Sequence, residues 1–110
     1  MNFIINQEIA NYGLILSMEF GDYWLKPINE RLSKKNPELL PIELEKYNKL
    51  CKEVNTFAND FIRKKPLKNN GELTFLPFED FKQAILKKYT WINEENLKRL
   101  YSQSCYYAWK

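Results

Sequence analysis

The segment PIELEKYNKLCKEVNTFANDFIRK, residues 41–64, carries the clearest helical pattern in the chain. At about 100° per residue, its apolar side chains fall within about 140° of one another. These residues are Tyr47, Leu50, Cys51, Val54, Phe57, Ala58, Phe61 and Ile62. The polar side chains on the opposite side are Lys49, Lys52, Thr56, Asp60 and Arg63. The segment therefore predicts an amphipathic core helix with one solvated face.

Prolines bound this helix on both sides. Pro66 ends it after the basic cluster Arg63-Lys64-Lys65, whose positive charges are favoured at a helix C-terminus. Upstream, the run SKKNPELLP at residues 33–41 contains two prolines and an Asn-Pro step, which disfavour a continuous helix. Further upstream, Pro27 marks either a kink or a new helix start.

A second helix is predicted over residues 6–20, with apolar residues at spacings of three and four. Leu14, Ile15 and Met18 add apolar surface on its other sides. Such a helix is either central and buried, or it meets a second surface through an oligomer interface. Gly13 in its middle indicates a close helix crossing, or is simply tolerated at a cost of about 1 kcal/mol relative to alanine.

The C-terminal part of the chain predicts two further helices. One covers residues 78–89, and the other covers residues 94–107 with Asn93 as its N-cap. Between them and the core helix, Asn70-Gly71 favours a hairpin, although residues 73–75 also suit pairing with residues 3–5. We expect a single all-α domain over residues 1–110, an irregular bundle of four to five helices with room for a very short β-hairpin near residues 67–75.

The composition is that of a folded globular protein. Hydrophobic residues make up 45% of the 110 residues and charged residues 28%, close to the average for soluble domains. The apolar run at residues 14–16, like every other run in the chain, is far below the roughly 20 residues that cross a bilayer. The N-terminus lacks the basic and apolar regions of a secretory signal, so we expect a cytoplasmic location and no membrane association.

The residue inventory argues against catalysis. The chain has no histidine, so a Ser-His-Asp or Cys-His nucleophile cannot be assembled from it. Its three glycines are scattered, and its two cysteines, Cys51 and Cys105, lack metal-binding spacing. The acidic pairs at residues 79–80 and 94–95 stand at helix starts, where the helix dipole explains them. We expect no enzyme activity, no cofactor, no metal site and two reduced thiols.

The last helix carries the best candidates for a binding surface. Its apolar stripe consists of Leu97, Leu100, Tyr101, Ser104 and Ala108. Tyr106 falls on the opposite side with Arg99, Ser102 and Gln103, and Trp109 lies between the two faces. Either these rings are ordinary exposed or folded-back side chains, or they form a contact patch, since Tyr, Trp and Arg are enriched at binding hot spots. The candidate partner-binding residues are Tyr106, Trp109, Arg99, Trp91, Arg63, Lys64 and Lys65.

The charge distribution favours a charged partner. Residues 1–30 carry four acidic side chains against one lysine, whereas residues 31–110 carry sixteen basic against ten acidic. Lysine-rich faces steer an acidic partner. The first hypothesis is therefore a non-catalytic protein-binding module that occludes or bridges a protein partner, as immunity proteins, antitoxins, phage-encoded inhibitors and adaptors do.

Two alternatives stay open. One is a nucleic-acid-binding protein that uses residues 78–89 and the helix from Glu94 as a helix-turn-helix, although Glu94 and Glu95 would then approach phosphates. The other is a homodimer formed through the first helix, with Leu14, Ile15 and Met18 as the contacts.

Overall fold

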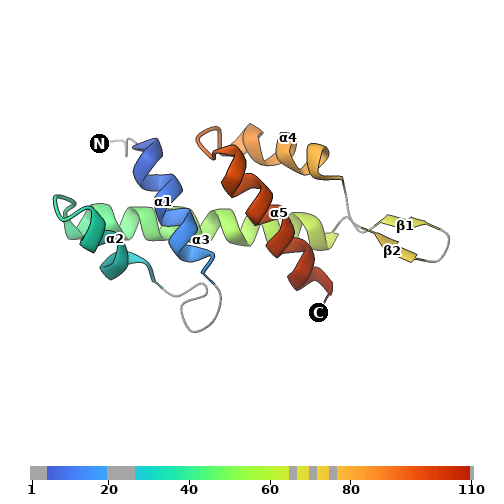
Figure 1. Ribbon diagram of the computed structural model, residues 1–110, viewed down its shortest axis with the longest axis horizontal. Helices are drawn as coiled ribbons and strands as arrows, with labels where there is room; N and C mark the ends of the chain where they lie inside the picture. The colour runs from blue at the N-terminus through green and yellow to red at the C-terminus, as the bar shows by residue number, and fades with distance from the viewer. Residues whose placement is uncertain (1–4, 20–26, 65–66, 70–71, 75–76, 110) are drawn as a thin grey trace. The chain divides into compact units, whose positions relative to one another are not determined.

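The computed structural model describes residues 5–19, 27–64, 67–69, 72–74 and 77–109, and the side chains of 67–69, 72–74 and 107–109 lie outside that description (Figure 1). The described residues form the helices α1 (Gln7–Ser17), α2 (Asn29–Lys35), α3 (Pro41–Lys64), α4 (Phe78–Lys88) and α5 (Glu94–Trp109), and the strands β1 (Leu67–Asn69) and β2 (Glu72–Thr74). The all-α class is confirmed. The chain divides into two compact units, residues 1–54 and 55–110, and α3 contributes to both.

The amphipathic helix begins at Pro41, as predicted. The Leu40 carbonyl oxygen accepts the first helical hydrogen bond from the Leu44 N–H at 3.0 Å. The Glu43 carboxylate in turn accepts the Leu40 N–H at 2.9 Å. This contact is one half of a capping box, and it fixes the chain just before the helix. The predicted interruption between helices, residues 33–41, is shorter in the structure, because α2 continues to Lys35.

In the first unit, α1 is capped by Asn6, whose side-chain oxygen accepts the Ile9 N–H at 3.2 Å. The helix ends at Ser17, earlier than the predicted end at Phe20, which lies outside the described residues. Arg31 of α2 donates to the Leu16 carbonyl oxygen at 3.0 Å and pairs with Glu19 at 3.1 Å. Because α1 has no basic residue in its last turn, Arg31 supplies the cation that its C-terminus favours.

The inner side of α3 holds the first unit together. The Tyr47 hydroxyl accepts the Asn6 N–H at 3.1 Å, and the Asn48 side-chain oxygen accepts the Ile28 N–H at 3.0 Å. Gly13 meets this side so closely that an added Cβ would lie 3.1 Å from Ile28 and 3.3 Å from the Cys51 sulfur. Gly13 therefore lies in tight contact with these two side chains, while the close helix crossing stays a prediction.

The structure corrects two of the three predicted dimer contacts on α1. Leu14 and Met18 are completely buried, and Ile15 is half-buried. Residues that pack inside one chain cannot offer the same surface to a second copy. At Leu14 and Met18 the apolar character of α1 thus reflects burial, the other explanation that the pattern allowed, whereas a dimer contact at Ile15 stays a prediction.

In the second unit, β1 and β2 pair antiparallel with Leu67 opposite Thr74 and Asn69 opposite Glu72. The Asn70-Gly71 turn lies outside the described residues, as do residues 3 and 4 of the alternative pairing. Helix α4 confirms the predicted helix at residues 78–89, ending one residue earlier. The Asn93 cap is also confirmed, because its side-chain oxygen accepts the Asn96 N–H at 2.9 Å.

Aromatic rings from α3, α4, α5 and the turn after α4 form a connected series inside the second unit. Neighbouring ring centroids lie 5.2 to 6.5 Å apart, the range of stacked and edge-to-face pairs. In order of contact, the rings are Phe78, Tyr101, Phe81, Phe61, Phe57, Tyr89 and Trp91. Most of the chain's C-terminal aromatic residues with described side chains therefore serve the core.

Candidate protein-binding surfaces

Helix α5 presents two of the predicted contact residues at its surface. The Tyr106 side chain is 51% exposed, and Arg99, two turns earlier on the same face, is half-buried. Gln103 was predicted to share this face, but the structure buries it. Its side-chain nitrogen donates to the Asn55 side-chain oxygen at 3.3 Å, so the exposed face is narrower than the pattern suggested.

The other predicted contact residues are not all at the surface. Trp91 is only 7% exposed and its ring packs edge-on against Tyr89, so the structure removes it from the candidate surface. Arg63 and Lys64 are exposed in the last turn of α3. Lys65 and the side chain of Trp109 lie outside the described residues.

Among the residues whose side chains the structure describes, the most exposed large hydrophobic ones stand at the start of α3. Leu40 is 60% exposed and Ile42 is 63% exposed. Neither residue was a candidate in the sequence analysis. A signal was nevertheless present for Ile42, which falls about 130° from the centre of the apolar stripe of α3 on the same helical projection.

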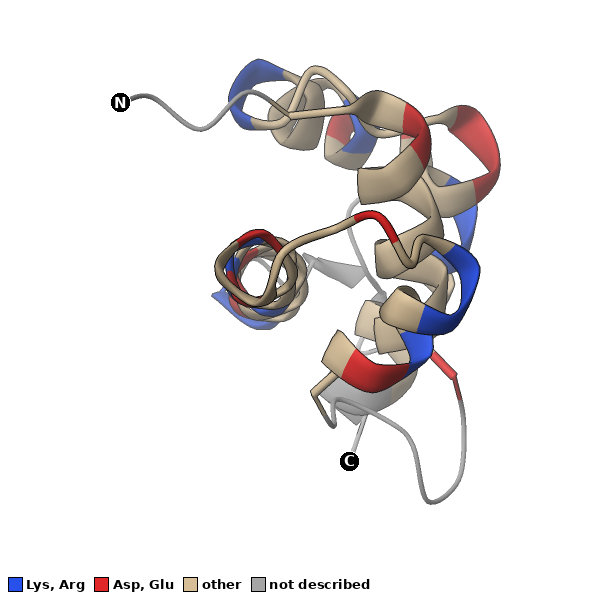
Figure 2. Ribbon diagram, turned by 90° about the vertical axis from the view of Figure 1, so that its left-hand side faces the viewer, with Lys and Arg blue, Asp and Glu red and all other residues tan. Residues whose placement is uncertain are grey.

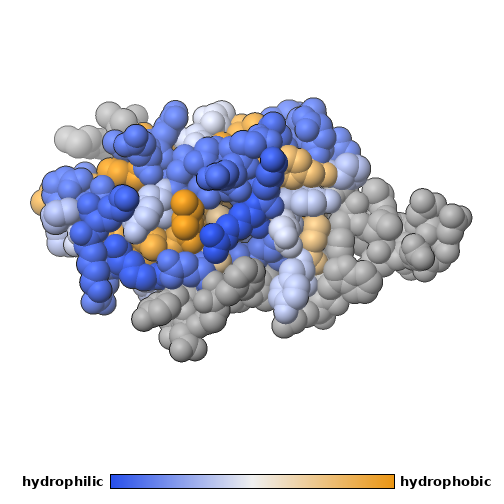
Figure 3. Space-filling model, in the orientation of Figure 1, coloured by the Kyte–Doolittle hydropathy of each residue, from blue (hydrophilic) through white to orange (hydrophobic). Residues whose placement is uncertain are grey.

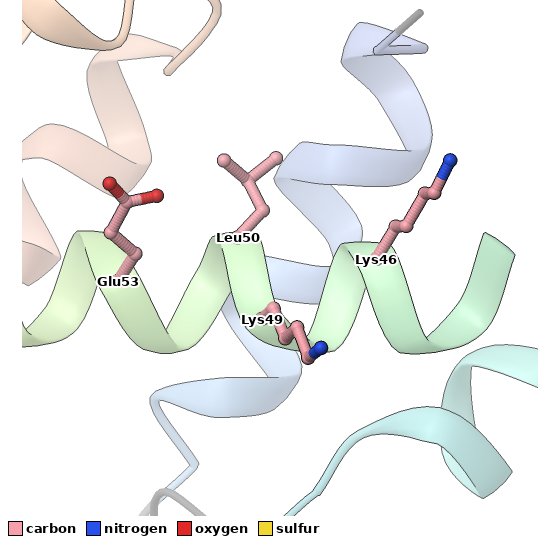
Figure 4. Close-up of a pocket in the computed structure, with 4 residues that line it drawn as sticks. All are labelled: Lys46, Lys49, Leu50 and Glu53. Carbon is pink, nitrogen blue, oxygen red and sulfur yellow. The ribbon is translucent and has the colours of Figure 1, made fainter. Parts of the chain in front are cut away.

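Beyond Ile42, the same side of α3 bears a shallow hollow of about 310 Å³. Its lining residues are Lys46, Lys49, Leu50 and Glu53. Figure 4 shows Leu50 between Lys46 and Glu53 along the helix, with Lys49 on the adjoining side. We call Leu40, Ile42 and these four residues the α3 outer face. It lies entirely within the first unit.

Charged side chains of both signs lie on and beside this face. Lys46 and Lys49 are both exposed. Glu45 accepts a hydrogen bond from the Asn29 side chain at 3.0 Å, which draws its carboxylate towards α2. The Glu43 carboxylate is engaged by the Leu40 N–H. Glu53 is the acidic residue that lines the hollow itself, so the hollow has two ammonium groups against one carboxylate.

A second hollow, of about 210 Å³, lies in the second unit. Phe57, Asp60, Phe61 and Lys64 line it. The Lys88 ammonium lies 4.6 Å from the Phe57 ring centroid and 5.5 Å from the Tyr89 centroid, so it already stands over one of the two rings that line the hollow. Both phenylalanines belong to the aromatic core series, and we interpret this hollow as the edge of that core.

Charges of both signs occur on several helices (Figure 2). On the side of the molecule drawn in Figure 3, hydrophobic residues appear as small separate areas among hydrophilic ones. In the part of the chain that the structure describes, no group of three or more Cys, Asp or Glu side chains is arranged to hold a metal ion. Within the same part, no helix has the length and apolar character needed to cross a membrane.

Cys51 and Cys105 are not joined in a disulfide, and the Cys51 thiol donates to the Ala10 carbonyl oxygen at 3.8 Å. Burial raises the pKa of Cys51 from its ordinary value of 9.0 to about 12. Burial also raises the pKa of Cys105, while a hydrogen bond with Tyr101 acts in the opposite direction. Both thiols are therefore protonated near neutral pH and are poor nucleophiles.

Helices α4 and α5 follow one another along the chain as the two helices of a helix-turn-helix do. The charges on α5, however, are unfavourable for binding DNA. Glu94 and Glu95 are exposed in the first turn of α5, where a recognition helix would meet the groove. Glu94 also pairs with Lys82 at 2.8 Å. This contact partly neutralises a lysine that phosphate binding would use.

Comparison with protein-family models, with curated proteins and with solved structures finds no match to the chain.

Proposed function

We propose that this protein is a non-catalytic protein-binding module that acts by occluding or bridging a protein partner, and that the α3 outer face is its principal contact surface. The observation that carries the proposal is the joint exposure of Leu40 and Ile42. Burial of a leucine or isoleucine side chain is worth about 1.5–3 kcal/mol, and a partner that covers both residues recovers this free energy.

The local geometry supports the proposal because the apolar pair is held in place before any partner arrives. Ile42 belongs to the first turn of a 24-residue helix, and Leu40 is fixed by the Glu43 contact at 2.9 Å. A preordered surface loses little conformational entropy when it binds. Leu40 and Ile42 are thus suited to act as anchor residues.

The α5 face with Tyr106 and Arg99 is proposed as an additional contact surface. An exposed tyrosine and an arginine two turns apart on one helix are residue types that supply binding energy in protein interfaces. Tyr106 is the third large hydrophobic side chain that is exposed among the described residues. Each of the two surfaces is tested independently below.

The test is an affinity capture from host lysate with matched variants. In the Leu40→Ser/Ile42→Ser variant we expect loss of a discrete partner protein that the unmodified chain retains. Leu40→Met/Ile42→Val is the control, because it keeps apolar surface and should retain the partner. Tyr106→Ser tests the α5 face in the same way, and circular dichroism verifies that each variant is folded.

The same capture, repeated after nuclease treatment, separates protein binding from nucleic-acid binding. A partner that survives the nuclease and depends on Leu40 and Ile42 supports the proposal. If the captured material disappears after nuclease treatment and its amount falls steeply as salt increases, the result supports nucleic-acid binding instead. Retention of the partner by Leu40→Ser/Ile42→Ser contradicts the assignment of the α3 outer face.

A further inference from the structure

We draw no further inference here: the strongest candidate, the surface patch that Leu40, Ile42 and the shallow hollow beside them form on α3, belongs to the site already described, and nothing in the part of the chain that the structure describes shows what covers it.

Discussion

In the second unit, the side-chain nitrogen of Gln103 donates a 3.3 Å hydrogen bond to the side-chain oxygen of Asn55, and both residues are almost completely buried. The bond joins α5 to α3 in the interior of the second unit, where Asn96 and Ser104 are also buried. A buried amide is tolerated when it is hydrogen-bonded and becomes costly when its partner is removed.

Replacement of Gln103 by alanine should therefore lower the free energy of unfolding by about 1–3 kcal/mol, because Asn55 loses this donor in a buried position. The double variant Asn55→Leu/Gln103→Leu should be closer to the unmodified protein than either single leucine variant, since no amide then lacks its partner. Urea denaturation of the unmodified protein and these four variants measures the differences. Strict additivity of the two single effects would show that the pair is not coupled.

Gly13 should tolerate alanine but not a large side chain. Its added Cβ would lie 3.1 Å from Ile28 and 3.3 Å from Cys51, and the gain in helix propensity of about 1 kcal/mol offsets the small displacement required. Gly13→Leu should destabilise the protein by roughly 1–3 kcal/mol or more, because there is no space for the side chain. Thermal unfolding compared with Gln7→Leu, at an exposed position of the same helix, tests this. Equal stability of the two leucine variants would contradict the close crossing.

Cys51 should make the protein less stable in alkali. Its pKa is about 12 when buried and near 9.0 when unfolded, so the unfolded chain loses its proton first as pH rises. The free energy of unfolding should consequently fall between pH 9 and 12, by up to about 1.4 kcal/mol per pH unit. Cys51→Ala should show a shallower decline over the same interval. If the free energy of unfolding declines in parallel with pH for the two proteins, this role of the Cys51 thiol is excluded.

Arg31 should contribute to the stability of the first unit through the end of α1. Arg31→Ala removes the hydrogen bond to the Leu16 carbonyl and the ion pair with Glu19, and we expect a loss of about 1–3 kcal/mol. Arg31→Lys should lose less, because it retains the charge but lacks the forked donors. Chemical denaturation of both variants measures the effect. An unchanged midpoint for Arg31→Ala would mean that solvent replaces these contacts without cost.

Features that depend on local sequence were predictable. The 3.6-residue periodicity of residues 41–64 predicts α3, and the Asn93 side chain predicts the cap of α5, which the structure confirms at 2.9 Å. Gly13 likewise indicated a close helix crossing. These signals operate within a few residues, so one sequence suffices to recognise them.

Features that depend on contacts between distant residues were not predictable in the same way. Gln103 lies on the polar side of its helix by pattern, yet Asn55, 48 residues away, provides a partner that permits its burial. Trp91 is buried because it packs against the Tyr89 ring, which itself packs against Phe57 of α3. Leu40 precedes its helix, so helical periodicity does not report its exposure.

The most direct test of the proposed function is the affinity of an isolated partner for the Leu40→Ser/Ile42→Ser variant, measured by isothermal titration beside Leu40→Met/Ile42→Val. We predict that the serine variant loses about 3 kcal/mol of binding free energy or more, a reduction in affinity of more than about a hundredfold, while the Met/Val variant stays within about tenfold of the unmodified protein. Equal affinity of the serine variant and the unmodified protein, with both folded, would contradict the assignment of the α3 outer face as the binding surface.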